Sequence, residues 1–528
     1  MKKLHYISLW ISFSVFGWMS CQPDLLETIP NDRISKEIFW QSLADAEFAA
    51  NAVYPTLDGT ELFSYDGLTD HLLTNHPFNA NVELQRGFGT IASGRYFNEW
   101  QDAYQAIRRA NDFMDNIDQI EENDQGAINR LKGEVMTLRA YHYIKLAMLF
   151  GDVPLITSGI DIETGRSITR DPLNEIWDFV SSDLNQAADW LPYQNDGRVS
   201  KGAALGLRAR AMLYAGRYAE SAAAAKTIID SQEYALYPDY FEMFQYEGEN
   251  NQEVILVREF AADVNSHNIY ATGAPWSQIP GSTGSLYVPT QAIIDLYPMA
   301  NGLLISDPES GYDPRNPYEN RDPRLYHSVF LSERTPLPDG GIYGSTPGTD
   351  GSDAVQITVY STATGYNIRK YVDEEDYTNP SNSGLNIILL RYAEVLLTYA
   401  EAKIELGEID QSVYDAINQV RQRESVDMPP ITPDQSATTD ELREMVRTER
   451  SIELAFEGFR LFDIRRWRIA EEVMPGVPNG MTYVNNSELV QITLEGFDRS
   501  FDTARDYLWP IPNRERELNT KLTQNPGW

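Results

Sequence analysis

Amphipathic helical patterns recur along most of this chain of 528 residues. Between residues 173 and 191, apolar side chains are spaced three or four positions apart, which predicts a helix with one apolar face. A second stripe runs from residue 100 to residue 117. Residues 131–150 are apolar on several sides, which predicts a helix buried in the centre of the molecule.

Two later segments, residues 207–230 and 396–423, resemble each other. Each predicts a helix, a tight turn that contains Gly216 or Gly407, and a second helix. This is the pattern of tetratricopeptide units, although the two copies are not repeated at a fixed period. We therefore expect a mainly α fold, with a scaffold of tetratricopeptide-like helical hairpins.

The composition changes between residues 231 and 385, where Gly, Pro, Ser, Thr and Tyr replace the helical stripes. Residues 253–259 and 355–360 are the strand candidates there. Long loops in a folded protein are often functional. We expect a leader at 1–20, an N-terminal helical part at 21–230, a loop-rich ligand-binding insertion at 231–385 and a C-terminal helical part at 386–528.

The leader places two lysines before an apolar run at residues 4–19, as in an export signal peptide. The run ends two residues before Cys21. Because Cys21 is the only cysteine in the sequence, an internal disulfide is excluded. Ser20 suits a lipoprotein cleavage site, whereas Trp18 and Met19 depart from the usual pattern. We expect lipidation of Cys21, and the alternative is an inert thiol within the leader.

The chain carries 78 acidic and 43 basic residues, a formal net charge of −35. This charge repels phosphate groups, so a nucleic-acid partner is excluded. After Cys21 no apolar run is long enough to span a bilayer, so membrane attachment is expected through the lipid alone.

Motifs for catalysis and metal binding are missing from the sequence. It has no H-E-x-x-H, Walker A, G-x-S-x-G or S-x-x-K motif. His71 and His76 form a loose pair that is more typical of polar surface than of a metal site. We predict no metal and no cofactor.

The densest charge cluster is the segment RTERSIELAFEGFRLFDIRRW, residues 447–467. Glu449, Glu453 and Glu457 recur every four residues, so a glycosidase with paired carboxylates is one hypothesis. The interleaved arginines would keep these carboxylates ionised, whereas a general acid needs a raised pKa. The favoured interpretation is a structural network of ion pairs.

Six motifs follow the leader in the same order in which one known family carries them. They are WQDAYQAIRRANDFMDNI, GEVMTLRAYHYIKLAMLFGDVPLI, YENRDPRL, LLRYAEVLLTYAEAKIELGE, the charged segment and the C-terminal LWPIPNRERELNTKLTQNPGW. The chain resembles the SusD/RagB family of nutrient-binding surface lipoproteins. The resemblance implies a helical body beneath ligand-binding loops, an outer-membrane location on the cell surface, and a SusC-like TonB-dependent transporter as partner.

Aromatic rings that stack on sugar faces are the feature sought for a glycan site. Trp276 alone among the tryptophans lies in a loop of Gly, Pro and Ser, with Tyr270 and Tyr287 nearby. It is our first candidate for a ligand platform, and the alternative is a tryptophan that anchors the loop in the core.

Family ligand contacts tend to come from the region before the WQDAYQAI helix, here residues 65–88. The resemblance therefore nominates Asp70, Asn81 and Arg86, with Phe78 or Tyr65 as aromatics. The alternative for each is an ordinary surface loop residue.

Three functions follow from these observations. The first, which we favour, is noncatalytic binding of nutrient oligomers for uptake, with oligosaccharides preferred to peptides as the ligand. The second is a glycoside hydrolase. The third is an assembly lipoprotein whose helical hairpins bind protein.

Overall fold

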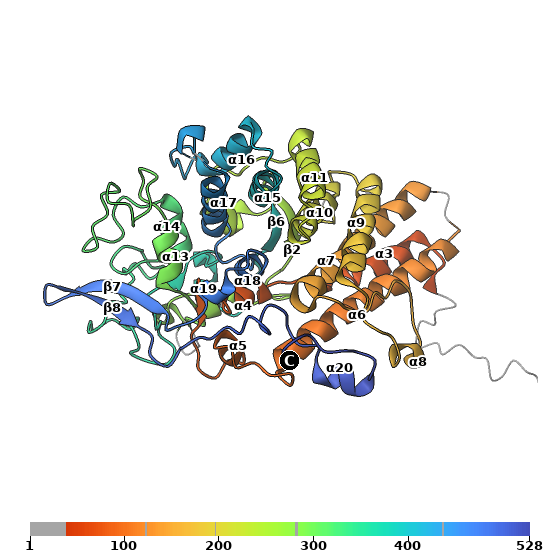
Figure 1. The fold of residues 1–528 in the computed structure, drawn as a ribbon, viewed down its shortest axis with the longest axis horizontal. Coiled ribbons are helices and arrows are strands. Elements are labelled where there is room, and N and C mark those ends of the chain that lie inside the picture. Colours follow the sequence, from red (N-terminus) through yellow and green to blue (C-terminus); the bar gives the residue numbers. More distant parts are fainter. Residues whose placement is uncertain (1–38, 122–123, 196, 280–283, 436–437) are drawn as a thin grey trace, which may run out of the picture.

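The computed structural model describes residues 39–121, 124–195, 197–279, 284–435 and 438–528, so Cys21 lies outside the described residues. The expectation of a mainly α fold is confirmed, because long helices form most of the ordered structure and the strands are few and short. Figure 1 shows the helices side by side in one half of the molecule and the loops in the other.

The helical half is a succession of packed helices, each in contact with the next in the chain or the next but one. Its members are α3 (Leu43–Asn51), α6 (Gly94–Asn116), α7 (Gln125–Phe150), α9 (Leu173–Trp190), α10 (Lys201–Tyr214), α11 (Tyr218–Ser231), α15 (Tyr392–Glu405), α16 (Gln411–Arg421) and α17 (Thr439–Glu453).

The apolar patterns account for where these helices lie. Ile176, Trp177, Val180 and Leu184 on α9 are buried, as their spacing predicts, and α9 packs against α7 and α10. Helix α7 is buried on almost every side along its second half and packs against α3, α6, α9 and α10. A helix that is apolar all round is stable only in such a surrounded position.

The two predicted hairpins are present as helix pairs α10–α11 and α15–α16. Gly216 and Gly407 follow the first helix of each pair with φ of 70° and 73°. These left-handed conformations suit glycine because it has no Cβ, and they allow the chain to reverse within a few residues. Helices α11 and α15 also pack together, so the two hairpins form one layer.

The other half of the molecule holds short elements connected by loops. They include β1 (Leu72–Thr74), α12 (Ile269–Gly273), η7 (Trp276–Gln278), β3 (Tyr287–Pro289), α13 (Gln291–Leu296), α14 (Pro323–Ser328), β4 (Val329–Phe330) and β5 (Asn367–Ile368). The antiparallel strand pairs are β1–β3, β4–β5, β2 (Val254–Arg258) with β6 (Ile387–Arg391), and β7 (Asn479–Asn485) with β8 (Glu488–Thr493).

Strand β2 confirms the first of the two strand predictions, but the second is wrong. Residues 355–360 form turns. Gln356 has a φ of 58°, and the Oγ1 atom of Thr358 accepts hydrogen bonds from the backbone N–H groups of Tyr360 and Ser361. Such local bonds from threonine compete with strand pairing.

The C-terminal segment returns to the helical half. The backbone N–H of Trp509 donates to the carbonyl of Leu149 at 2.7 Å, and the Asn525 amide donates to the carbonyl of Phe150 at 2.8 Å. These bonds satisfy carbonyls at the end of α7, which have no partner within the helix.

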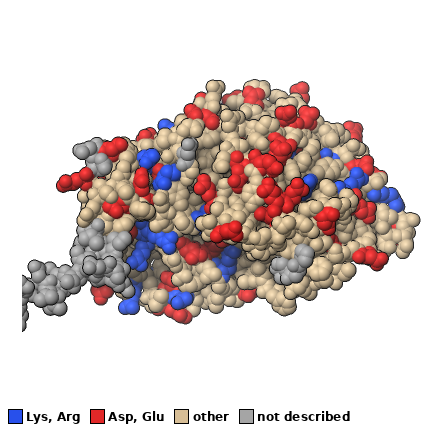
Figure 2. Space-filling model, turned by 180° about the vertical axis from the view of Figure 1, so that it is seen from behind, with Lys and Arg blue, Asp and Glu red and all other residues tan. Residues whose placement is uncertain are grey.

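Acidic side chains are spread over the face shown in Figure 2, where they form a band across its middle. Part of the net negative charge is therefore displayed on this face of the molecule.

Candidate functional site

The charged segment is an interior scaffold element. Glu449 and Glu453 lie on α17 and Glu457 follows it, and all three are almost fully buried. Arg391 donates to Glu453 at 2.6 Å and to Glu457 at 2.8 Å, and Arg423 donates to Glu453 at 2.8 Å. The predicted network of ion pairs is confirmed.

The electrostatics of this network do not suit a general acid. Burial raises the pKa of Glu453, but the guanidinium groups of Arg391, Arg423 and Arg324 outweigh burial and hold this pKa well below its usual range. Arg324, on α14, also donates to Glu449 at 2.5 Å. Arg421, the last residue of α16, donates to Glu449 at 2.6 Å. The network therefore joins α14, β6, α16 and α17, and so fixes the helical half to the loop half.

Four of the six predicted ligand residues are buried in the structure. Tyr270 is fully buried in a small cluster with Phe330 and Tyr343. Asn81 is 4% exposed, and Tyr287 lies in β3, paired with Thr74 of β1. A loop rich in Gly, Pro and Ser can fold its aromatic residues inward, which composition does not reveal.

Asp70 is the fourth buried residue. Its carboxylate accepts two hydrogen bonds from the guanidinium of Arg460, at 2.9 and 2.7 Å. Burial raises the pKa of Asp70, but the charge of Arg460 outweighs it and holds the pKa well below its usual range. Its partners are therefore within the protein.

The remaining two, Arg86 and Trp276, are half-buried. Arg86 lies over the ring of Phe88, with 5.0 Å from its guanidinium carbon to the ring centroid, and next to Asp498 of the C-terminal segment. Trp276 begins η7, whose next residue, Ser277, donates to the Asp353 carboxylate through its N–H at 2.8 Å and its hydroxyl at 2.5 Å.

Loops from three parts of the chain meet at Asn75. Its side-chain amide donates to the carbonyls of Ser285 and Ser361, each at 2.9 Å, and its side-chain oxygen accepts from the N–H of Ala363 at 3.2 Å. His76 contacts the carbonyl of Gly284 at 2.7 Å. We call residues 75–78, 274–278, 284–285 and 357–363 the loop junction.

Aromatic side chains are exposed at the loop junction. Phe78 is 89% exposed, and Tyr360 is 38% exposed with its ring 5.4 Å from that of His76. Trp276 belongs to the same junction, because its backbone approaches Gly284, the residue that His76 contacts. The sequence nominates Phe78 and Trp276 for this site but not Tyr360, which falls in the wrongly predicted strand at 355–360.

The structure offers no metal site among the residues that it describes. No three side chains of His, Cys, Asp or Glu converge there as metal ligands. His71 is buried beside Asp70, and His76 bonds to the backbone, so the two histidines have separate partners. In the described part of the chain, no helix has the length and apolar character needed to cross a membrane.

Comparison with known proteins decides the family. The sequence model of the SusD family matches residues 252–528, and a related model, described as "Starch-binding associating with outer membrane", matches residues 48–213. The chain belongs to the SusD family. The expected family membership is confirmed, and the helical body and loop half are those of a SusD-like fold.

Individual relatives extend the match over nearly the whole chain. SusD-like protein P2 of Formosa agariphila is 28% identical over 526 residues, which cover 95% of this chain and 96% of the relative. A SusD-like carbohydrate-binding protein of Bacteroides fragilis is 28% identical, with a TM-score of 0.84 over 92% of this chain and all of the other. A second SusD-like protein of B. fragilis is 26% identical, with a TM-score of 0.82 over 95% of this chain and all of the other.

Proposed function

We propose that this SusD-family protein binds nutrient oligosaccharides at the loop junction without cleaving them. The observation that carries the proposal is the group of exposed or half-exposed aromatic side chains, Trp276, Tyr360 and Phe78, on loops that Asn75 ties together. Aromatic faces stack on the C–H surfaces of sugars, and fixed loops reduce the entropy lost on binding.

The relatives support a glycan over a peptide. One B. fragilis structure at 28% identity is that of a carbohydrate-binding protein, and the family model matched at residues 48–213 is described as starch-binding. Binding of peptides or other nutrients by the same junction is the alternative.

Binding without catalysis is favoured by the location of the carboxylates. The cluster that suggested a hydrolase, Glu449, Glu453 and Glu457, is buried in ion pairs with arginine and lysine. A glycosidase needs two carboxyl groups that reach a bound sugar. The four buried residues among those predicted, Asp70, Asn81, Tyr270 and Tyr287, would then stabilise the loops without touching the ligand. Arg86, which bonds to the backbone of Asp498, would lie outside the loop junction.

The cellular part of the proposal rests on the sequence and the family. We propose that Cys21 carries a lipid that anchors the protein at the outer membrane, on the cell surface. The ligand then passes to a SusC-like TonB-dependent transporter, which the lipoprotein covers. The family description of association with the outer membrane supports this location.

The test is a binding screen of residues 22–528 against oligosaccharides and peptides, with the products checked for cleavage. We expect saturable binding of one glycan class, no cleavage, and loss of binding in Trp276→Ala with an unchanged thermal melt. Phe48→Ala, which removes another exposed aromatic, on α3 in the helical half, is the matched control. Cleavage products, or full binding by Trp276→Ala, would contradict the proposal.

A further inference from the structure

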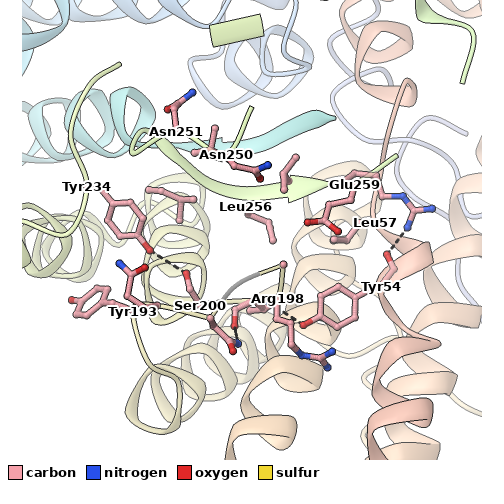
Figure 3. A pocket seen from close by; sticks show the side chains of 18 of the residues that line it. Tyr54, Leu57, Tyr193, Arg198, Ser200, Tyr234, Asn250, Asn251, Leu256 and Glu259 are labelled. Atoms are coloured by element: carbon pink, nitrogen blue, oxygen red, sulfur yellow. Dashed lines mark hydrogen bonds between the residues drawn. The ribbon is translucent and has the colours of Figure 1, made fainter. Parts of the chain in front are cut away.

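A cavity of about 770 Å³ lies between the helical half and strand β2 (Figure 3). One wall is formed by η3 (Tyr54–Thr56) and by residues of the connection from α9 to α10, including Tyr193, Arg198 and Ser200. The other wall includes every residue from 254 to 259. None of the loop-junction residues lines this cavity, which has the size of a ligand site.

Strand β2 borders the cavity with one of its edges. The side chains of a strand alternate between two faces, so a cavity against one face would be lined by every second residue. Six consecutive residues line this one, which indicates the edge. Figure 3 shows β2 crossing above the cavity with β6 on the side away from it.

The edge of β2 that borders the cavity is unpaired within the described part of the chain. The sheet has two strands, and only β6 pairs with the backbone of residues 255–258 among the described residues. An edge strand directs part of its N–H and C=O groups outward. Ile255 lies at a bulge and has no partner on β6, which adds to the unpaired backbone.

The two arginines that line the cavity have hydrogen-bond partners within the protein. Arg198 bonds to Glu134 and Asn51, both at 2.8 Å, and Arg258 donates to the carbonyl of Tyr54 at 2.7 Å.

Glu233 and Glu259 are exposed, and neither has an ion pair among the residues that the structure describes, although Glu233 accepts a hydrogen bond from the side-chain amide of Gln194 at 3.3 Å. Arg198 is paired with Glu134, so Arg258 is the one unpaired cation among the described lining residues that faces these two carboxylates. The available charge at this cavity is therefore negative, as is that of the whole chain. Tyr193 and Tyr234 form an aromatic corner, with ring centroids 6.3 Å apart.

We infer that this cavity binds an extended peptide segment carrying Lys or Arg, which adds to β2 as a third strand. The N–H and C=O groups of an extended peptide have the same spacing as those along the edge of β2, so the two backbones can pair. This main-chain pairing is a general mode of peptide recognition. Basic side chains then meet Glu233 and Glu259, and apolar ones meet the tyrosines. A sugar would leave the regular series of backbone groups only partly paired.

The experiment uses residues 22–528 and a library of capped octapeptides with Lys at alternate positions and Ala, Thr, Val or Tyr between them. Bound peptides are identified by mass spectrometry and then measured singly. We expect saturable binding, and slower amide hydrogen exchange at residues 254–259 with bound peptide. Methylation of alternate peptide nitrogens removes backbone donors but keeps the side chains, and we expect it to weaken binding at least tenfold.

Two protein variants complete the test. Because both glutamates are exposed, Glu233→Gln with Glu259→Gln preserves the fold, and we expect it to weaken binding about tenfold. Trp276→Ala, at the loop junction, is expected to leave peptide binding unchanged, which separates this inference from the proposed function. Failure of the whole library to bind, equal binding of the methylated peptides, or binding of maltohexaose in this cavity instead would overturn the inference.

Discussion

The guanidinium of Arg460 and the carboxylate of Asp70, 390 positions apart in the chain, form a two-point ion pair at 2.9 and 2.7 Å. The pair joins the loop that follows α4 (Glu61–Asp66) to the start of α18 (Arg460–Arg466). Removing one partner of a buried pair leaves the other charge uncompensated.

We therefore expect Asp70→Asn to lower the free energy of unfolding by about 3 kcal/mol. Urea denaturation measures this loss. Asp118→Asn is the control, because Asp118 pairs with Lys132 at 2.6 Å but its side chain is 72% exposed, and an exposed pair contributes less than about 1 kcal/mol. Equal losses in the two variants would show that the buried pair contributes no more than the surface pair.

Asp66 predicts a pH dependence of stability. Burial raises its pKa to about 7, although the N–H groups of Gly458 and Arg460 donate to it. Its unfolded pKa is about 4. Since the folded pKa is the higher one, the stability from protonated Asp66 is present below pH 4 and is lost as the pH rises through about 7.

Asp66→Asn removes this titration. Wild type loses the stability from protonated Asp66 as the pH rises from 5 to 8, whereas the variant does not. The unfolding free energy of the variant minus that of wild type is therefore expected to be larger at pH 8 than at pH 5, as measured by urea denaturation at both values. A constant difference between the two proteins over this range would contradict the assignment.

Glu453 accepts from three arginines in the interior, so Glu453→Gln leaves their charge uncompensated. We expect a loss of about 3–5 kcal/mol in unfolding free energy. Glu444→Gln, on the same helix but with a 73% exposed side chain, is expected to change stability by less than about 1 kcal/mol. A Glu453→Gln protein as stable as Glu444→Gln would rule out the scaffold role.

Much of the fold could be predicted from the sequence, because the apolar residues of a helix that buries one face recur about every 3.6 positions. The apolar spacing on α9 and the two glycine turns are local signals of this kind. The failed strand at 355–360 has alternating apolar residues, but Thr358 bonds to the nearby backbone instead.

The candidate site was less predictable because burial in loops depends on distant partners. The family resemblance nominates Asp70 as a ligand residue, but its carboxylate pairs with Arg460, and nothing within residues 65–88 indicates that pairing. The composition of its loop indicates Trp276, and the family resemblance nominates Phe78. The position of Tyr360 depends on the turn at 358–361 and on the contact with His76, which neither signal reveals.

The exposed aromatics of the loop junction give a prediction about affinity. Phe78→Ala and Tyr360→Ala are each expected to weaken binding of the glycan found in the screen by about fivefold, because a stacking contact contributes about 1 kcal/mol. Isothermal titration calorimetry measures the affinity, and thermal melts check that the fold is intact. Unchanged affinity in both variants would place the ligand elsewhere.

Cys21 gives a prediction about attachment. When cells that produce the protein are grown with labelled palmitate, the wild-type chain is expected to take up the label and to sediment with membranes. Cys21→Ala is expected to lose the label and the sedimentation together. A labelled or membrane-bound Cys21→Ala protein would show that another residue is the anchor.

The bonds from Trp509 and Asn525 to the end of α7 have a consequence for how the protein is made. Helix α7 obtains these partners only after residues 509–525 have been synthesised. Contacts between distant parts of a chain form slowly, and incomplete intermediates expose apolar surface. Folding is therefore expected to finish only when this segment docks on the end of α7, and chaperones would protect the unfinished chain until then.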